Sequence, residues 1–330
     1  MRAPRAVSLV ALVGCGNNLP APGSCEVPTT DEAATVTHVA LFGQGASFDD
    51  VRFSPQLDKV IVAPQGTGRL YVVEPDTLEV RIAAVPGGSA SADADASQIY
   101  VADRSADRII AIDAVTLEQV ASGNTDSNPD YVRVAPTVPE IWVTLPGKNR
   151  IDILDPRTLT RIGSVLLPIA PEGLTFDANG FAYTQGGSRA VLIDVERRIV
   201  IGDYDTGCGS SHGFPQIDAE LGLVIAGCSS NGGAAVVTTT GSLRTGIEAG
   251  GNAAILAYDD VRHHLYLRGD PGDTLDIIAT CADGGMSVLE SVSIPRTGHG
   301  ATADNRGNVW VCDSTTGGLL QITDPFPATR

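Results

Sequence analysis

The amino-acid sequence predicts an all-β fold, a β-propeller of seven four-stranded blades. Three observations support this prediction: strand-like segments recur about every 40 residues, turn-forming residues are spread along the chain, and a surplus strand at one end matches a missing strand at the other. The 330 residues include 37 Gly and 20 Pro. Gly, Pro or β-branched residues interrupt every apolar 3.6-residue period before it reaches helix length, so a parallel α/β fold would lack its crossover helices.

Seven short apolar segments are expected to be the second strands of the blades. Their centres are separated by 39, 42, 40, 42, 42 and 44 residues, which is the spacing that four-stranded blades require. About ten residues after a centre, residues 69–78, 108–117 and 150–159 repeat an apolar run closed by an acidic residue and Thr, as expected for a third strand that turns into a fourth. The centres are Ile61, Tyr100, Trp142, Ala182, Val224, Tyr266 and Trp310.

The last blade is expected to be completed by the amino-terminal end of the propeller. Strands predicted near residues 300–303, 308–312 and 318–323 leave this blade without its outer strand, whereas residues 36–42 form an extra strand before the first blade. Pairing the two closes the ring and covers an edge that would otherwise promote aggregation. We therefore place the propeller at residues 35–324 and a carboxy-terminal tail at 325–330.

The amino-terminal residues resemble a bacterial lipoprotein signal. Arg2 and Arg5 precede a short apolar stretch, residues 6–13, and the quartet Leu12-Val13-Gly14-Cys15 resembles the lipobox that directs a lipid onto its cysteine. This predicts a signal peptide at 1–14, lipidation of Cys15 and a tether at 15–34; an ordinary signal with an incidental cysteine is the alternative. Gly16 and Asn17 follow Cys15, not the Asp that commonly retains such lipoproteins at the inner membrane, so the resemblance implies the outer membrane.

The charge distribution restricts the partners. The formal net charge is −17, and the 22 Lys and Arg residues form no cluster that could neutralise a run of phosphates, so we do not expect nucleic acid to bind. The expected partners are the membrane, through the lipid, and a protein or small molecule.

Two sets of motifs resemble known propeller families. Residues 99–103 (IYVAD) and 141–144 (IWVT) are similar to the motif of YVTN-repeat propellers, and Gly298-His299-Gly300 with residues 308–311 (NVWV) resembles NHL-type and virginiamycin B lyase-like repeats. The similarity to gluconolactonase-like propellers is looser. The resemblance implies a propeller fold, but these groups include lactonases, lyases, quinone-dependent dehydrogenases and interaction scaffolds.

A candidate site is expected at the mouth of the central channel, where residues just before the first strands converge. Carboxylates and imidazoles there could bind a divalent cation or act as an acid–base pair. The same residues could instead hold neighbouring blades together through hydrogen bonds and ordered water. The aligned positions are Asp49, Gly88, Asp130, Glu172, His212, Ala254 and His299, with Asn252 nearby.

The sequence thus supports two functional hypotheses. The first is an envelope lipoprotein whose propeller binds a ligand or protein at the channel mouth. The alternative is a metal-dependent lyase or lactonase that uses His212, His299 and Glu172. The lactonase-like group holds its metal with acidic and amide side chains, and Asn252 is the one amide near this ring. The sequence does not identify a cofactor beyond a candidate divalent cation.

The cysteines and two further histidines complete the predictions. In an oxidising compartment, strand direction favours a Cys208–Cys228 disulfide and, more weakly, a Cys25–Cys281 disulfide, which leaves Cys312 as a free thiol. His263 and His264 fall in a turn between first and second strands, where we expect them to be exposed.

Overall fold

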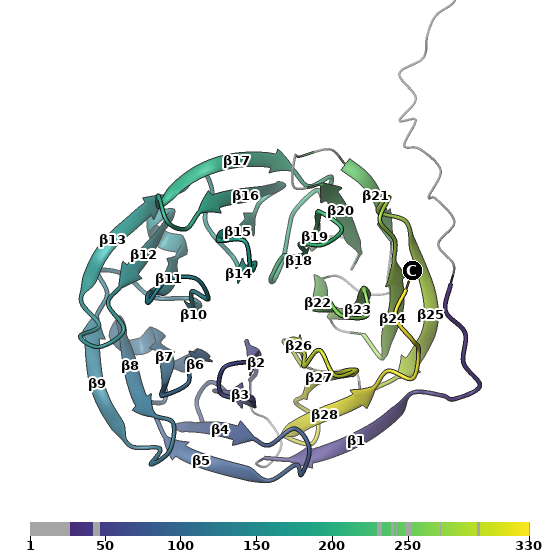
Figure 1. Ribbon diagram of the computed structural model, residues 1–330. Helices are drawn as coiled ribbons and strands as arrows, with labels where there is room; N and C mark the ends of the chain where they lie inside the picture. Colours follow the sequence, from purple (N-terminus) through teal and green to yellow (C-terminus); the bar gives the residue numbers. More distant parts are fainter. Residues whose placement is uncertain are drawn as a thin grey trace, which may run out of the picture.

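The computed structural model describes residues 27–329 except 42–46, 230–232, 239–240, 242, 248–252, 271 and 296–297. Across these residues the strands form seven antiparallel four-stranded sheets, arranged as blades around a central axis (Figure 1). The described helices are two short 3-10 helices, η1 (Arg104–Ala106) and η2 (Pro146–Lys148). The predicted seven-bladed β-propeller is confirmed.

The first two strands of each blade lie nearest the axis. The innermost strands are β2 (Val51–Ser54), β6 (Ser89–Ala94), β10 (Val132–Val134), β14 (Leu174–Phe176), β18 (Gln216–Asp218), β22 (Ala253–Asp259) and β26 (Ala301–Ala303). The second strands are β3 (Lys59–Val62), β7 (Gln98–Asp103), β11 (Ile141–Leu145), β15 (Phe181–Gly186), β19 (Leu223–Gly227), β23 (His264–Asp270) and β27 (Asn308–Asp313). Every predicted centre lies in a second strand, which confirms the repeat.

The third and fourth strands form the outer part of each blade. The third strands are β4 (Arg69–Val73), β8 (Arg108–Asp113), β12 (Arg150–Leu154), β16 (Arg189–Asp194), β20 (Ala234–Thr238), β24 (Thr274–Thr280) and β28 (Gly318–Thr323). The outermost strands are β5 (Val80–Ala84), β9 (Gln119–Asn124), β13 (Arg161–Leu166), β17 (Ile199–Asp205), β21 (Leu243–Ile247), β25 (Met286–Ser293) and β1 (Thr35–Ala40). In the turn before β13, Asp155 Oδ1 accepts the backbone N–H groups of Arg157 and Thr158, both at 2.9 Å, which explains the repeated acidic residue.

Strand β1 closes the ring, as predicted. It runs antiparallel to β28, with Thr35 opposite Thr323 and Ala40 opposite Gly318, and so supplies the outer strand of the last blade (Figure 1). Val39 is the buried residue of this strand, and it packs in the core formed by the first and last blades.

Acidic residues at the turns between first and second strands satisfy the polar atoms of the buried aromatic centres. Trp142 Nε1 donates to Glu140 Oε2 at 2.9 Å, and Tyr100 Oη donates to Asp95 Oδ2 at 2.8 Å. Buried Trp and Tyr side chains need such partners, because an unpaired N–H or O–H in the core is costly. The turn before the strand supplies this partner for Tyr100, Trp142 and Trp310, whereas Tyr266 Oη donates to Asp324, after β28, at 2.9 Å.

The expected exposure of His264 is wrong. Its side chain is fully buried, with Nδ1 at 2.7 Å from Asp324 Oδ2 and Nε2 at 3.1 Å from Thr329 Oγ1. The segment after β28 folds back and covers this histidine, a contact across 60 residues that local sequence does not reveal. His263 is partly buried, with Nδ1 at 2.6 Å from Asp218.

The cysteine predictions are confirmed where the structure describes both partners. Cys208 and Cys228 form a disulfide, and Cys312 is a buried free thiol. Cys281 is disulfide-bonded, whereas its predicted partner Cys25 lies outside the described residues, as does Cys15. Neither of the described helices has the length and hydropathy needed to cross a bilayer.

We predict that ring closure depends on Val39. Val39→Asp should lower the free energy of unfolding by about 3 kcal/mol or more, because it places an unpaired carboxylate in the core between the first and last blades. The exposed neighbour Thr37 provides a matched control: Thr37→Asp should change stability by less than about 0.5 kcal/mol. Urea unfolding of both variants measures the difference, and equal losses would contradict the closure role.

Candidate functional site

Side chains from several blades meet in one cluster at an end of the channel, which we call the channel mouth. The Arg104 guanidinium makes ion pairs with both Asp49 and Asp130. The rings of His212 and His299 are in edge-to-face contact, with centroids 4.8 Å apart. Glu172 joins the two groups, since its carboxyl interacts electrostatically with Asp49, Arg104 and His299. The channel mouth consists of Asp49, Arg104, Asp130, Glu172, His212 and His299.

The sequence prediction missed Arg104. In its blade the predicted position is Gly88, whose carbonyl oxygen accepts the Arg104 N–H at 3.0 Å, and a Cβ at Gly88 would overlap the side chains of Asp103 and Ser105. The basic side chain therefore comes from η1, in the loop between the second and third strands. Loops of this kind share a face with the residues before the first strands, so the topology used to pair Cys208 with Cys228 could also have identified Arg104.

The carboxylates of the mouth are only partly neutralised. The pKa of the Asp130 carboxyl is raised to about 7, first by burial and also by the negative charges of Asp49 and Glu172, against the opposing charge of Arg104. Burial also raises the pKa of Glu172, with a further contribution from Asp49, while His299 and Arg104 lower it. Both shifts have one physical cause: three carboxylates share a partly desolvated space with one guanidinium.

The remaining predicted positions do not extend this cluster. Ala254 is fully buried and has no polar side chain to offer, and Asn252 lies outside the described residues. Within the described part of the chain, no group of three or more His, Cys, Asp or Glu side chains is arranged to hold a metal ion. The paired imidazoles, with Glu172 next to His299, have the chemistry for proton transfer, and the lyase or lactonase hypothesis stays a prediction.

Beneath the mouth lies a buried layer that we call the plug, formed by Asp50, Tyr131, Arg133 and Phe214. Arg133 donates to Asp50 through both terminal nitrogens, at 2.8 and 2.9 Å, and the two side chains are 3% and 2% exposed. Its guanidinium stacks on Phe214 at 4.4 Å from the ring centroid, and Phe214 contacts the edge of Tyr131. The charge of Arg133 is thus satisfied internally, and the plug supports the floor of the mouth.

The fold and this site define the chain as a seven-bladed β-propeller with a charged channel mouth. No protein-family model matches it, and no curated protein sequence matches it. Among solved structures, it is similar to a chain of a mitotic checkpoint complex (14% identity, TM-score 0.72, 98% of this chain and 99% of that chain) and to the WD40 repeats of RRP9 (7%, 0.72, 91% and 99%). It is also similar to hydrazine synthase from Kuenenia stuttgartiensis (13%, 0.71, 88% and 98%). At these identities the similarity shows the fold alone, and the YVTN or NHL resemblance remains a prediction.

We predict a pH-dependent stability that originates at Asp130. An unfolded Asp releases its proton near pH 4, whereas folded Asp130 keeps it until about pH 7, so raising the pH across this window favours the unfolded chain. Asp130→Asn should therefore become more stable relative to the wild type as pH rises from about 4 to about 7, with no further change above. Urea unfolding at several pH values tests this. Glu118→Gln, at an exposed position, makes the same change in charge and is the control, and a stability difference between Asp130→Asn and the wild type that stays constant with pH would contradict the prediction.

Proposed function

We propose that this chain is a protein-binding scaffold that receives a cationic side chain of its partner in the channel mouth. One observation carries the proposal: carboxylates from three blades, Asp49, Asp130 and Glu172, surround the single guanidinium of Arg104. A lysine or arginine of a partner would add the positive charge that this cluster lacks.

The environment of the mouth makes such a contact effective. The side chains of Asp49, Arg104 and Asp130 are only 21–22% exposed, so solvent screens their charges less than it screens ordinary surface charges. Two unit charges 4 Å apart interact by about 4 kcal/mol at the effective dielectric constant near a protein surface, and desolvation of the incoming cation offsets part of this. The expected net gain is modest but selective for cations.

The fold and the overall charge are consistent with this role. A propeller presents loops of all its blades around one opening, and one of the compared propellers is a chain of a mitotic checkpoint complex, in which this fold serves in an assembly. The net charge of −17 would also accelerate encounter with a basic partner.

We predict that the mouth discriminates peptides by charge. Acetyl-Gly-Lys-Gly-amide should bind weakly in calorimetric titrations, less at high salt and more at pH 8 than at pH 5.5, whereas acetyl-Gly-Glu-Gly-amide should not bind. Glu172→Gln and Asp49→Asn should each weaken binding about fivefold or more, because each removes a carboxylate from the cluster. The exposed Glu118→Gln makes the same change in net charge and should bind as the wild type does. Equal binding of both peptides would refute the proposal.

The scaffold is further proposed to be anchored by lipid to a bacterial membrane, most consistently the outer membrane. The support is the sequence before β1: a short apolar stretch, the lipobox-like quartet ending at Cys15, and a Pro- and Gly-containing tether. A lipid at Cys15 would leave the propeller linked to the membrane through its first strand.

We predict that lipidation requires Cys15. In cells fed an alkyne-labelled fatty acid, the wild-type chain should become labelled and should fractionate with membranes. Cys15→Ser should lose both properties, because it removes the acceptor sulfur. Cys25→Ser removes a thiol from the same region and should keep both. Membrane-associated, labelled Cys15→Ser protein would disprove the anchor.

A further inference from the structure

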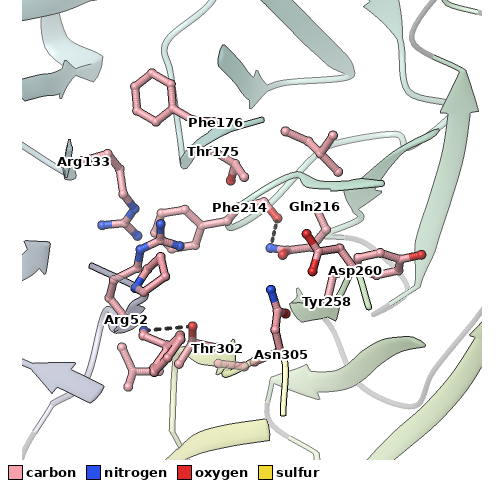
Figure 2. A pocket seen from close by; sticks show the side chains of 16 residues that line it. Arg52, Arg133, Thr175, Phe176, Phe214, Gln216, Tyr258, Asp260, Thr302 and Asn305 are labelled. Atoms are coloured by element: carbon pink, nitrogen blue, oxygen red, sulfur yellow. Dashed lines mark hydrogen bonds between the residues drawn. The ribbon is translucent and has the colours of Figure 1, made fainter. Parts of the chain in front are cut away.

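A second hollow lies in the channel, beyond the plug. It is a cavity of about 180 Å³ lined by residues of six innermost strands, by residues of the turns that follow them and by Phe214, just before β18. Figure 2 shows it with Arg52 and Arg133 on one side and Tyr258 and Asp260 on the other. In each contributing blade these residues follow the mouth position by two to six residues. Because a strand rises about 3.3 Å per residue, the cavity faces the end of the channel away from the mouth. None of the mouth residues lines it.

The cavity continues into a groove across this face. A hollow of about 190 Å³ shares Arg52, Pro55 and Phe176 with the cavity. A further hollow of about 370 Å³ shares Gln56, Val134 and Pro136 with the second one and reaches Pro156, in the turn between β12 and β13. The three hollows therefore follow one another from the axis outwards, a shape suited to an extended chain and larger than a small molecule needs.

Arg52 lies at the junction of the cavity and the groove, and its guanidinium has N–H donors that none of the described residues uses. Its Nε lies 3.4 Å from Asp93 Oδ1, at the long end of a hydrogen bond, and its terminal nitrogens donate to none of the described residues. Asp93 already accepts the backbone N–H groups of Ala94 and Val134, at 2.9 and 3.0 Å. Arg133, by contrast, is fully occupied by Asp50. A guanidinium held by one long contact presents a two-pronged donor that matches a carboxylate.

The other charges along the groove are occupied. Glu140 accepts Trp142 Nε1 at 2.9 Å and Arg198 at 2.6 Å. Asp95 accepts two backbone N–H groups and the hydroxyl of Tyr100. The groove walls otherwise include prolines and valines, which suit apolar side chains of an extended chain. Arg52 is thus the side chain with unused charge-assisted donors in this region.

The rest of the cavity offers the Asp260 carboxylate, on the side opposite Arg52 (Figure 2), and several uncharged polar groups. The Thr175 hydroxyl and the Asn305 amide make no hydrogen bond to described side chains or backbone, and Gln216 Nε2 makes contacts of 3.2 and 3.4 Å to backbone carbonyls. A volume of about 180 Å³ exceeds the roughly 150 Å³ that accommodates benzene in a protein core, so one polar side chain fits. These groups suit a terminal residue with an amide or hydroxyl.

We propose that this face binds the free carboxyl terminus of an extended peptide, with the terminal carboxylate on Arg52, the last side chain in the cavity and the preceding apolar residues along the groove. The site is separate from the channel mouth and does not depend on the function proposed for it.

Fluorescence anisotropy with labelled Gly-Ser-Ala-Val-Ala-Gln tests the proposal. The free acid should bind at least tenfold more tightly than its carboxy-terminal amide, because only the acid pairs with Arg52. N-acetylglutamine, which has the carboxylate but cannot fill the groove, should compete at least tenfold more weakly than the unlabelled hexapeptide. No difference between acid and amide, or equal competition by N-acetylglutamine, would overturn the proposal.

Variants separate the two parts of the site. Arg52→Gln should abolish the preference for acid over amide, and Arg52→Lys should retain part of it, whereas Arg69→Gln, at an exposed position in the same blade, should behave as wild type. Pro136→Glu, at an exposed position on the groove, should weaken the acid by charge repulsion. Glu172→Gln should leave binding unchanged, which distinguishes this site from the mouth. Circular dichroism confirms folding of each variant, and an acid preference that survives in folded Arg52→Gln would refute the proposal.

Discussion

The pairing of β1 with β28 is the constraint on which the rest of the structure depends. The residues of the channel mouth are separated by as many as 250 positions, from Asp49 to His299, and they meet only because seven blades close into a ring. Six residue pairs between Thr35–Ala40 and Gly318–Thr323 complete this closure. The β1–β28 pairing, at the outer edge of the ring, therefore determines whether the polar groups near the axis come together as a site.

The same closed ring produces two different environments within one channel. At one end, the loops bring three carboxylates close to one guanidinium, and burial raises the pKa of the Asp130 and Glu172 carboxyls. At the other end, Arg52 makes one long contact to Asp93, and the Asp260 carboxylate lies across the cavity from it. The plug lies between these two environments. Arg133 and Asp50 neutralise each other there through a bidentate ion pair, so neither charge is left for a ligand. The two ends of the channel therefore present different sets of charged side chains.

The sequence contained most of the fold, because each blade repeats the same local pattern: a buried second strand, an acidic turn and a fixed spacing. It also placed the five polar mouth residues that the structure describes at equivalent positions. Arg104 was missed because it belongs to another loop, and the burial of His264 was missed because Asp324 and Thr329 cover it from the far end of the chain. The groove beside Arg52 was equally hidden, since it is formed by turns of separate blades whose side chains share no pattern.

The Cys208–Cys228 disulfide restrains one side of the channel mouth. Cys208 precedes His212 by four residues, and the backbone of Ser211 and His212 pairs with Cys228 and Gly227, so the covalent bond restrains the loop that carries this imidazole. A crosslink that closes a loop of this length stabilises the folded protein by about 3 kcal/mol, because it lowers the conformational entropy of the unfolded chain. Thiols stay reduced in the cytosol and oxidise beyond it. Formation of this bond therefore restrains the backbone beside His212, and the reduced chain lacks that restraint.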